Sequence, residues 1–325
     1  MTGPSVVTLG ETMVCLALPE HGRSGGAVPL AIGIGGAESN VAIAVARLGV
    51  RSTWMSRVGA DDFGSMVVRE ILGQDVRVIA HRDPGAPTGL LVKEHRQGRP
   101  SKVRYYRAGS AASRLSPADL DEAAIDEAGV LHLTGITPAL GSQPAAAVDR
   151  AILVAREAET LVSFDVNYRS SLWSPSKAAP VLSRLAAGVD VVFAGLDEAQ
   201  LLIGGESVAP TGDPWAAGRE AATALSGLGP GHVVIKLGEH GALSLREGVI
   251  EEVRAFPVTV VDPVGAGDAF VGGYLGSLVS GQDSRACLSM GARLGALVCG
   301  ARGDWEGLLD WSGHDVLPVG QDVIR

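Results

Sequence analysis

The sequence has 325 residues, 46% of them hydrophobic and 19% charged, which suits one large buried α/β core and argues against disorder. Its formal net charge of −9 disfavours a nucleic-acid or anionic-membrane surface, and no apolar run reaches the roughly 20 residues of a membrane span. Three cysteines without C-x-x-C spacing and an N-terminus without a secretory signal pattern indicate a reduced, cytoplasmic protein.

The first segments of the chain predict a strand, an irregular stretch and a helix. Residues 6–9 are a short apolar strand of the kind that opens an α/β sheet. Residues 19–30 are rich in Gly, Pro and polar residues and have only a weak strand pattern, so we expect them to belong to a lid outside the main sheet. Residues 41–49 have the apolar pattern of a helix that ends at its glycine.

A glycine-rich loop precedes this helix and offers room for a ligand. Gly36 carries no side chain that would block one, and Asn40 presents both a donor and an acceptor to sugar hydroxyls. The alternative is a tight packing turn that Asn40 merely caps.

Two strand-like runs, residues 88–94 and 102–107, surround a polar turn and predict a hairpin. The period of two places Tyr105 and Arg107 on one face, where Arg can bind a carboxylate with two parallel bonds and Tyr adds an apolar surface. The alternative is a solvated strand with no ligand.

Helices are predicted on both sides of the hairpin, over residues 63–72 and 117–128. Asp61 or Asp62 is the expected N-cap of the first, because Asp side chains accept bonds from the free amides of a first turn.

Polar residues follow the next two predicted strands. Ile136 lies just after the strand at 130–133, where α/β proteins bind ligands, and His132 within that strand is expected to be a hydrogen-bonded core residue. If the strand at 161–169 stays extended, Asn167 and Arg169 share a face suited to a phosphate or a carboxylate. The alternative is a structural cap with a surface arginine.

Two further strand ends carry candidate residues. The strand at 189–193 leads into a helix that contains Glu198. Lys236 ends the strand at 232–237, and Gly238 and Gly241 make a turn that is either a ligand border or a plain glycine hairpin.

A turn near the C-terminal end connects an apolar run to a helix. Residues 256–261 are a predicted strand, which should end before Pro263 because proline cannot donate to a ladder. Gly265 and Gly267 let backbone amides approach a ligand, and the N-terminus of the helix predicted over 269–279 favours an anion. The turn therefore predicts an anion hole.

Asp268 places a carboxylate beside this anion hole. The pairing suits phosphoryl transfer, in which the amides from Gly265 through Ala266 to Asp268 hold the developing charge and the carboxylate takes the proton of the attacking hydroxyl. An unperturbed Asp has a pKa of about 3.9, so it must accept that proton as the new bond forms. The alternative is a glycine turn with Asp268 as a helix cap.

The string DPVGAGDAF resembles the D-x-x-G-A-G-D-x-F signature of the ribokinase-like (phosphofructokinase B) family of sugar kinases. The resemblance implies a single domain over residues 1–325, built as a three-layer α/β sandwich around a mostly parallel sheet. It further implies a β-sheet lid from about 12–30 and 87–109, the use of ATP and Mg²⁺, and homo-oligomers formed through the lid.

Other strings are similar to those of 2-keto-3-deoxygluconate kinases, among them YYRAGSAAS, HLTGITPAL and RGDWEG. This similarity implies substrate contacts from Gly36, Asn40, Tyr105, Arg107, Ile136, Arg169 and Asp304. It implies nucleotide contacts from Asn167, Lys236, Gly238 and Gly241, and a magnesium role for Glu198. Three positions depart from the relatives' patterns: Leu91 in place of a Tyr, Gly195 in place of an Asn, and Ala292 in place of an adenine-facing Asn.

The resemblance implies ATP-dependent phosphorylation of 2-keto-3-deoxygluconate to its 6-phosphate. The alternatives are a kinase for a neutral sugar such as fructose or ribose, and a noncatalytic sugar sensor on the same fold.

Overall fold

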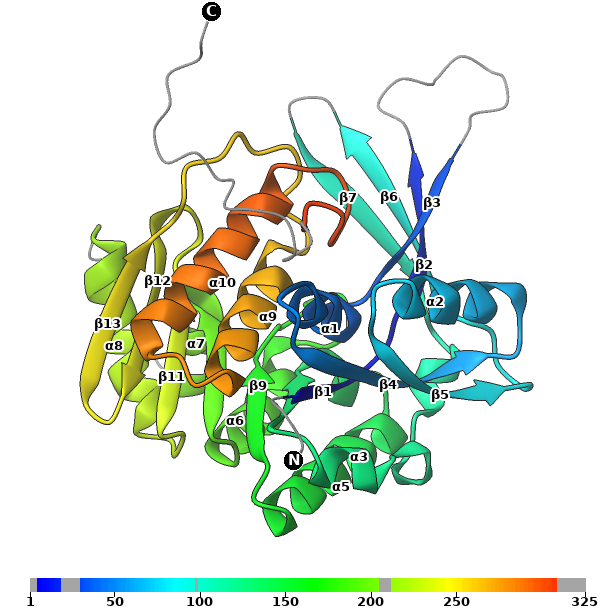
Figure 1. The fold of residues 1–325 in the computed structure, drawn as a ribbon, viewed down its shortest axis with the longest axis horizontal. Coiled ribbons are helices and arrows are strands. Elements are labelled where there is room, and N and C mark those ends of the chain that lie inside the picture. The colour runs from blue at the N-terminus through cyan, green and yellow to red at the C-terminus, as the bar shows by residue number, and fades with distance from the viewer. Residues whose placement is uncertain (1–4, 19–29, 97–98, 205–211, 309–325) are drawn as a thin grey trace, which may run out of the picture.

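A nine-stranded sheet forms the centre of the molecule, and a four-stranded sheet rises beside it in the computed structural model, which describes residues 5–18, 30–96, 99–204 and 212–308 (Figure 1). The strand order is β13-β12-β11-β10-β9-β8-β1-β4-β5. All pairs from β11 to β5 are parallel, and only the edge strands β12 and β13 are antiparallel. The predicted mostly parallel sheet is confirmed. Its strands are β1 (Ser5–Leu9), β4 (Arg51–Gly59), β5 (Arg77–Asp83), β8 (Val130–Thr134), β9 (Leu161–Asp165), β10 (Val191–Gly195), β11 (His232–Lys236), β12 (Gly241–Arg246) and β13 (Val249–Arg254).

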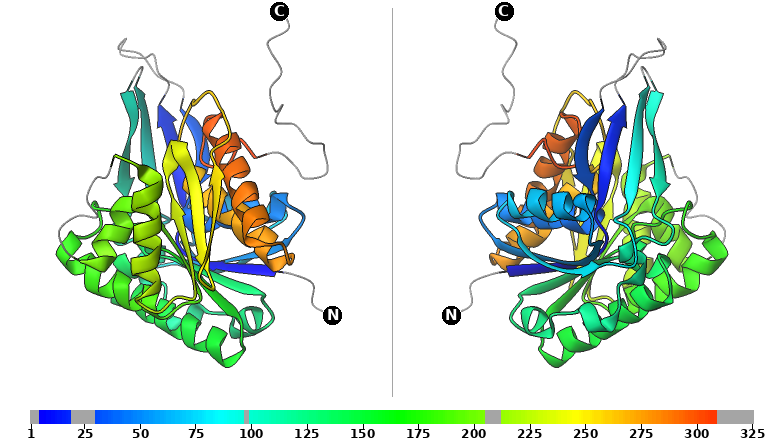
Figure 2. Two further views of the ribbon diagram at one scale, coloured as in Figure 1. Left: turned by 90° about the vertical axis from the view of Figure 1, so that its left-hand side faces the viewer. Right: turned by 90° about the vertical axis from the view of Figure 1, so that its right-hand side faces the viewer.

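Helices cover both faces of this sheet, as the edge-on views in Figure 2 show. Two apolar layers result, one holding Val148, Leu182 and Phe164 and the other holding Val45, Phe193 and Tyr274, all of them buried. The first face carries α3 (Glu122–Asp126), α5 (Ser142–Glu157), α6 (Pro175–Ala187), α7 (Leu196–Ile203) and α8 (Pro214–Ser226). The second carries α1 (Ala37–Arg47), α2 (Asp62–Leu72), α9 (Ala266–Val279) and α10 (Ser284–Cys299). Short turns complete the list: α4 (Ile136–Ala139), η1 (Ala111–Arg114), η2 (Pro117–Asp119) and η3 (Gly238–His240).

The small sheet has the order β3-β2-β6-β7 and stands over the edge of the main sheet where its parallel strands end (Figure 1). Its strands are β2 (Met13–Leu18), β3 (Ala31–Gly35), β6 (Leu90–Arg96) and β7 (Arg99–Tyr106). The predicted hairpin is confirmed, because β6 pairs antiparallel with β7 and Leu91 lies opposite Tyr105. The lid includes β3, which follows the predicted lid segment 12–30, and of that segment residues 19–29 lie outside the described part.

Two predicted elements were wrong. Residues 256–261 form no strand; Val260 and Val261 are exposed, Pro257 has no amide to donate, and Val261 N bonds to Cys299 O at 2.8 Å. This apolar run therefore has no strand partner, and it borders a cavity instead. The helix predicted over 117–128 is only η2 followed by α3, since Asp119 and Asp121 each cap a short turn of their own.

Other predictions agree with the structure. Asp61 is the N-cap of α2, accepting from Gly64 N at 2.7 Å. His132 is buried, and its Nδ1 lies 2.9 Å from Ser163 Oγ while burial lowers its pKa to about 3. All three cysteines are free, and Cys15 and Cys287 are buried. Among the described residues, no helix combines the length and apolarity needed to cross a bilayer.

Candidate active site

A cavity of about 460 Å³ lies between the small sheet and the strand ends of the main sheet. It collects residues from at least six separate parts of the chain. The predicted substrate residues all line it, and they are Gly36, Asn40, Tyr105, Arg107, Ile136, Arg169 and Asp304. Asp268, Gly265 and Gly267 line it too, so the structure brings the predicted substrate side and the predicted catalytic turn together.

Asp268 is the third residue of α9 and is 8% exposed. Asn40 Nδ2 donates to its Oδ2 at 2.8 Å, and Asn167 Nδ2 lies 3.5 Å from its Oδ1. Burial raises the pKa of the Asp268 carboxyl to about 7, although the Asn40 hydrogen bond and the Arg169 charge both lower it. A carboxylate with a pKa near neutrality is a far better proton acceptor than an exposed one, which suits a general base.

The turn before Asp268 has a conformation that needs glycine. Gly265 has φ +82°, in the left-handed region, and a Cβ there would lie 1.9 Å from the carbonyl oxygen of Asp304. Ala266 N donates to Pro263 O at 3.3 Å within the turn. The next amides, of Gly267 and Asp268, have no intrahelical acceptor because they belong to the first turn of α9. The predicted anion hole would therefore depend on those two amides more than on that of Ala266.

A second cavity, of about 710 Å³, lies on the other side of the same turn. It shares Lys236, Pro263 and Gly267 with the first. The rest of its wall is mostly apolar or glycine, and includes Gly238, Gly241, Phe256, Val258, Ala266, Ala292 and Gly295. The N-terminus of α9 thus lies on the boundary between the two cavities, within reach of ligands in both.

The predicted nucleotide residues divide between these cavities. Lys236, Gly238 and Gly241 border the second, as the prediction requires. Asn167 lines the first, because the chain leaves β9 after Asp165 and Asn167 has φ +38°. The strand therefore does not remain extended to Arg169, but Asp165, Asn167 and Arg169 still line the same cavity.

Lys236 and Asp165 form a close ion pair at the boundary. Lys236 Nζ lies 2.8 Å from both Asp165 oxygens. Burial lowers the pKa of Lys236, but the attraction of Asp165 and Glu198 outweighs it and the pKa is raised overall. The ammonium is therefore charged at a position that borders both cavities.

Arg107 lies in the first cavity but is not free. Its Nε donates to Glu11 Oε2 at 2.6 Å, its Nη2 also contacts Glu11, and its guanidinium carbon lies 5.6 Å from the centre of the Tyr105 ring. Ser110 Oγ donates to the other Glu11 oxygen at 2.6 Å. Glu11 already neutralises much of the charge that the sequence offered to a substrate carboxylate.

Arg169 differs from Arg107 in this respect. It is exposed, it lines the same cavity, and it forms no ion pair with the described residues. Its charge lowers the pKa of Asp268, so the guanidinium lies near the Asp268 carboxylate. Of the two arginines, Arg169 is the better placed to receive a negatively charged group.

Glu198 is the residue that can serve a magnesium ion. Its Oε1 accepts from Tyr168 N at 2.9 Å and its Oε2 from Gly195 N at 2.8 Å. Each oxygen keeps a lone pair, and Glu198 faces the first cavity. The described residues hold no cluster of three or more metal-ligating side chains. This fits Mg²⁺, which is commonly held by one or two carboxylates together with water and substrate phosphates.

Four acidic and basic residues of the site were missed from the sequence. Glu11 and Glu38 line the first cavity, and Lys93 and Asp262 form a buried pair beside it. Glu38 is fully buried, accepts from Thr134 and Thr137, and has its pKa raised by burial. A Glu directly after the first strand, and a Lys inside an apolar strand run, are the signals that would have identified Glu11 and Lys93.

Comparison with known proteins identifies the family of this chain. A model of the pfkB family of carbohydrate kinases matches residues 4–310. The chain is 35% identical over 301 residues to a 2-dehydro-3-deoxygalactonokinase of Haloferax volcanii, covering 92% of each. It is 37% identical over 310 residues to a 2-dehydro-3-deoxygluconokinase of Bacillus subtilis, covering 93% of this chain and 91% of that one. The crystal structure of 2-dehydro-3-deoxygluconokinase from Thermotoga maritima superposes with a TM-score of 0.83 at 29% identity, covering 93% of this chain and 95% of the other.

Proposed function

Because the chain belongs to the pfkB family of carbohydrate kinases and is a phosphotransferase with an alcohol acceptor, we propose that its substrate is a sugar acid, 2-keto-3-deoxygluconate, phosphorylated to its 6-phosphate by ATP. The observation that carries the proposal is the exposed Arg169 guanidinium in the first cavity, beside Asp268. It offers charge-assisted bonds to a substrate carboxylate.

The remaining charges of the first cavity favour this role for Arg169. Glu11 pairs with Arg107, Asp165 with Lys236, and Asp304 with Lys93. Glu38 is buried and accepts hydrogen bonds from Thr134 and Thr137, and burial raises its pKa. Among the described residues that line the cavity, a carboxylate therefore meets one cation without an ion pair, Arg169, whereas Glu11, Asp165 and Asp304 each have a cationic partner.

The proposed chemistry places the sugar in the first cavity and ATP in the second. Asp268, with its pKa near 7, takes the proton of the acceptor hydroxyl as that oxygen attacks the terminal phosphorus of ATP. The amides of Gly267 and Asp268 hold the charge on the transferred group, and ADP leaves on the side of the second cavity.

Lys236 and Glu198 complete the phosphate environment. Lys236 borders both cavities, so its positive charge is available to phosphate groups at their boundary. When bound, Mg²⁺ supplies charge neutralisation on the phosphates, and Glu198 would hold it, mostly through water. Asn40 and Asn167 orient the Asp268 carboxylate toward the acceptor.

A second candidate acceptor is 2-keto-3-deoxygalactonate, since one of the similar proteins is a kinase of that name at 35% identity. The two sugar acids differ only in the configuration of one hydroxyl. Leu91 faces the first cavity where some relatives have a Tyr, so this chain has one fewer hydrogen-bonding group to distinguish them.

A panel of sugars assayed with ATP, Mg²⁺ and coupled ADP detection tests the proposal. We expect the highest kcat/KM with one of the two keto-deoxy sugar acids, and much lower values with fructose and ribose. Arg169→Gln should lower kcat/KM for the sugar acid by about 10- to 100-fold, the value of a charge-assisted bond, with little change for a neutral sugar. Equal losses for acid and neutral sugars would contradict carboxylate recognition by Arg169.

We also propose that copies of the chain associate through the lid. The strand β3 is at the edge of the small sheet; Leu30, which precedes it, is 42% exposed, and Ile32 within it is 57% exposed. An open edge with apolar side chains favours pairing with another strand. Light scattering of wild type and Ile32→Lys checks this, and a monomeric wild type would contradict it.

A further inference from the structure

Lys93 is a buried lysine on the lid strand β6 for which the catalytic chemistry above has no use. Its side chain is 2% exposed. Its Nζ lies 2.6 Å from Asp262 Oδ2 and 3.1 Å from Asp304 Oδ1. The three residues come from the lid, the segment before the catalytic turn and the loop that follows α10.

The ammonium is charged despite its burial. Burial lowers the pKa of Lys93, but the Asp304 and Asp262 carboxylates outweigh this effect, and its pKa is raised overall. A buried charge is costly unless it is paired, and removing one partner of such a set leaves the others uncompensated. The Lys93 ammonium and the carboxylates of Asp262 and Asp304 therefore compensate one another's buried charge.

Both partners of Lys93 shape the anion-hole turn. Asp262 Oδ1 accepts from Val264 N at 3.2 Å, while its Oδ2 faces Lys93. This side chain thus connects the lysine to the backbone just before Gly265.

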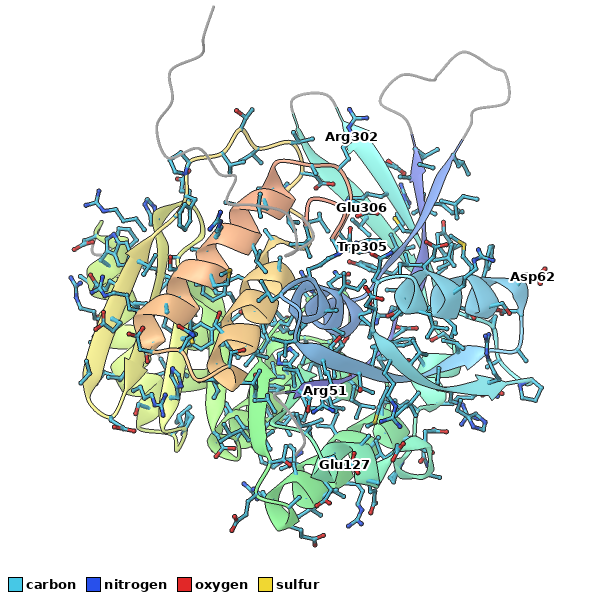
Figure 3. All side chains as sticks on the ribbon, viewed as in Figure 1. Arg51, Asp62, Glu127, Arg302, Trp305 and Glu306 are labelled. Carbon is cyan, nitrogen blue, oxygen red and sulfur yellow. The ribbon has the colours of Figure 1, made fainter. Side chains whose placement is uncertain are left out.

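Asp304 contacts the turn from the other side. Its carbonyl oxygen occupies the space that a Cβ on Gly265 would need, at 1.9 Å. Figure 3 shows its neighbours Arg302, Trp305 and Glu306 on the loop after α10, and both Asp304 and Glu306 border a groove with Cys15 and Ile32 of the lid. One ammonium therefore holds the two segments that enclose Gly265.

Strand β6 also contributes to the wall of the first cavity, where the sugar is proposed to bind. Leu91 lines the first cavity and lies two residues before Lys93, so both side chains are on one face of β6. Any displacement of this strand moves the cavity wall and the ammonium together.

We propose that Lys93 is a positioning residue that gives the Gly265–Asp268 turn its phosphoryl-binding shape only while the lid strand β6 is in place. The position of β6 and the shape of the turn are then linked through one ammonium group and its two carboxylate partners. The inference rests on the carbohydrate kinase activity and not on which sugar is the acceptor.

The test uses Lys93→Ala, assayed with whichever sugar the wild type phosphorylates best. A misplaced anion hole should lower kcat by about 100-fold. The KM for ATP should change by less than about threefold, since Lys93 and its two carboxylate partners do not line the second cavity. Lys177→Ala, at an exposed lysine of α6, is the matched control and should match the wild type.

Chemical rescue separates positioning from simple packing. Lys93→Ala lacks a three-carbon chain and its ammonium, so n-propylammonium should restore kcat saturably, whereas neutral n-propanol of the same size should not. Equal rescue by both, or no rescue of a folded variant, would overturn the proposal, as would a kcat within threefold of the wild type.

Asp262→Asn is the second variant, for the case in which Lys93→Ala does not fold. It leaves Lys93 paired with Asp304 and keeps an acceptor for Val264 N, so it weakens only the link from the lysine to the turn. We expect the same pattern of reduced kcat with a nearly unchanged KM for ATP. Turnover at the wild-type rate would overturn the proposal.

Discussion

The two cavities on either side of the N-terminus of α9 differ sharply in their walls. The first is lined by charged and amide side chains, among them Glu38, Asn40 and Arg169, and it includes residues of the lid. The second is lined mostly by glycine and apolar residues, such as Phe256 and Ala292, and it uses none of the lid strands. The first cavity offers hydrogen-bonding and charged groups to a ligand, whereas the second offers mainly shape and an apolar surface.

This difference shows how one turn can serve two ligands. In the proposed function, the polar cavity holds the acceptor hydroxyl beside the Asp268 carboxylate, whose pKa is raised, because specific orientation is needed there. The apolar cavity needs only to hold a flat ring system and direct phosphates at the helix N-terminus. Changes in the first should therefore affect catalysis, and changes in the second should affect nucleotide binding alone.

The largest expected effect comes from Asp268→Asn, which removes the proton acceptor and keeps the shape of the polar cavity. We expect kcat to fall by about a thousandfold, within the range for loss of a general base, while sugar affinity measured by calorimetry stays within about threefold. Near-normal turnover would show that the carboxylate is not the base.

The pH dependence of kcat/KM is a second test of Asp268 as the general base. Because the pKa of Asp268 is about 7, kcat/KM should rise about tenfold per pH unit up to pH 7 and then level, and Asp268→Asn should lack this step. Rate profiles from pH 5 to 9 measure it. A flat profile in the wild type would contradict the raised pKa.

Stability should show the opposite dependence. The folded pKa lies above the ordinary value of 3.8, so the contribution of Asp268 to stability is greatest below pH 3.8 and is lost as the pH rises to about 7. The gain in Tm of Asp268→Asn over the wild type should therefore be larger at pH 8 than at pH 5, as measured by thermal unfolding.

A substitution in the apolar cavity should affect only the nucleotide. Ala292→Leu places a larger side chain in that wall, and we expect KM for ATP to rise about tenfold while KM for the sugar stays constant. Ala286→Leu, on the same helix and outside both cavities, is the control. A rise in the sugar KM would break the separation of the two cavities.

The smallest effect distinguishes neighbouring tyrosines of β7. Tyr105 lines the polar cavity under the Arg107 guanidinium, whereas Tyr106 points away and is 62% exposed. Tyr105→Ala should raise the sugar KM about fivefold, and Tyr106→Ala by less than twofold. Equal effects in steady-state assays would place the substrate elsewhere.

Local patterns predicted most of the sheet and its helices, because several parallel strands, such as β8 and β10, are short apolar runs with a helix next in the chain. They failed at residues 256–261, where β-branched residues indicate a strand but no neighbouring strand is present to pair with it. Strand formation depends on such a partner, and the partner is a property of the tertiary structure.

Sequence motifs predicted which residues line the site. They did not predict the charge or pKa of those residues, because these depend on ion pairs and burial in the folded protein. Sequence placed Asp268, Asn40 and Arg169 in the site, but it gave no sign that Arg107 is neutralised by Glu11. It assigned Asp268 an ordinary pKa, because the burial that raises this pKa arises only when distant segments pack around it.

The Asn40–Asp268 hydrogen bond joins residues 228 positions apart, and the Lys93–Asp304 contact joins residues 211 positions apart. Contacts of such long separation form late in folding, because the entropy of closing a long loop must be overcome before they stabilise anything. A chain with most of its helices and strands already formed would still lack an oriented base. The return of turnover after dilution from denaturant should therefore report the final folding step, and lag behind the recovery of helical circular dichroism.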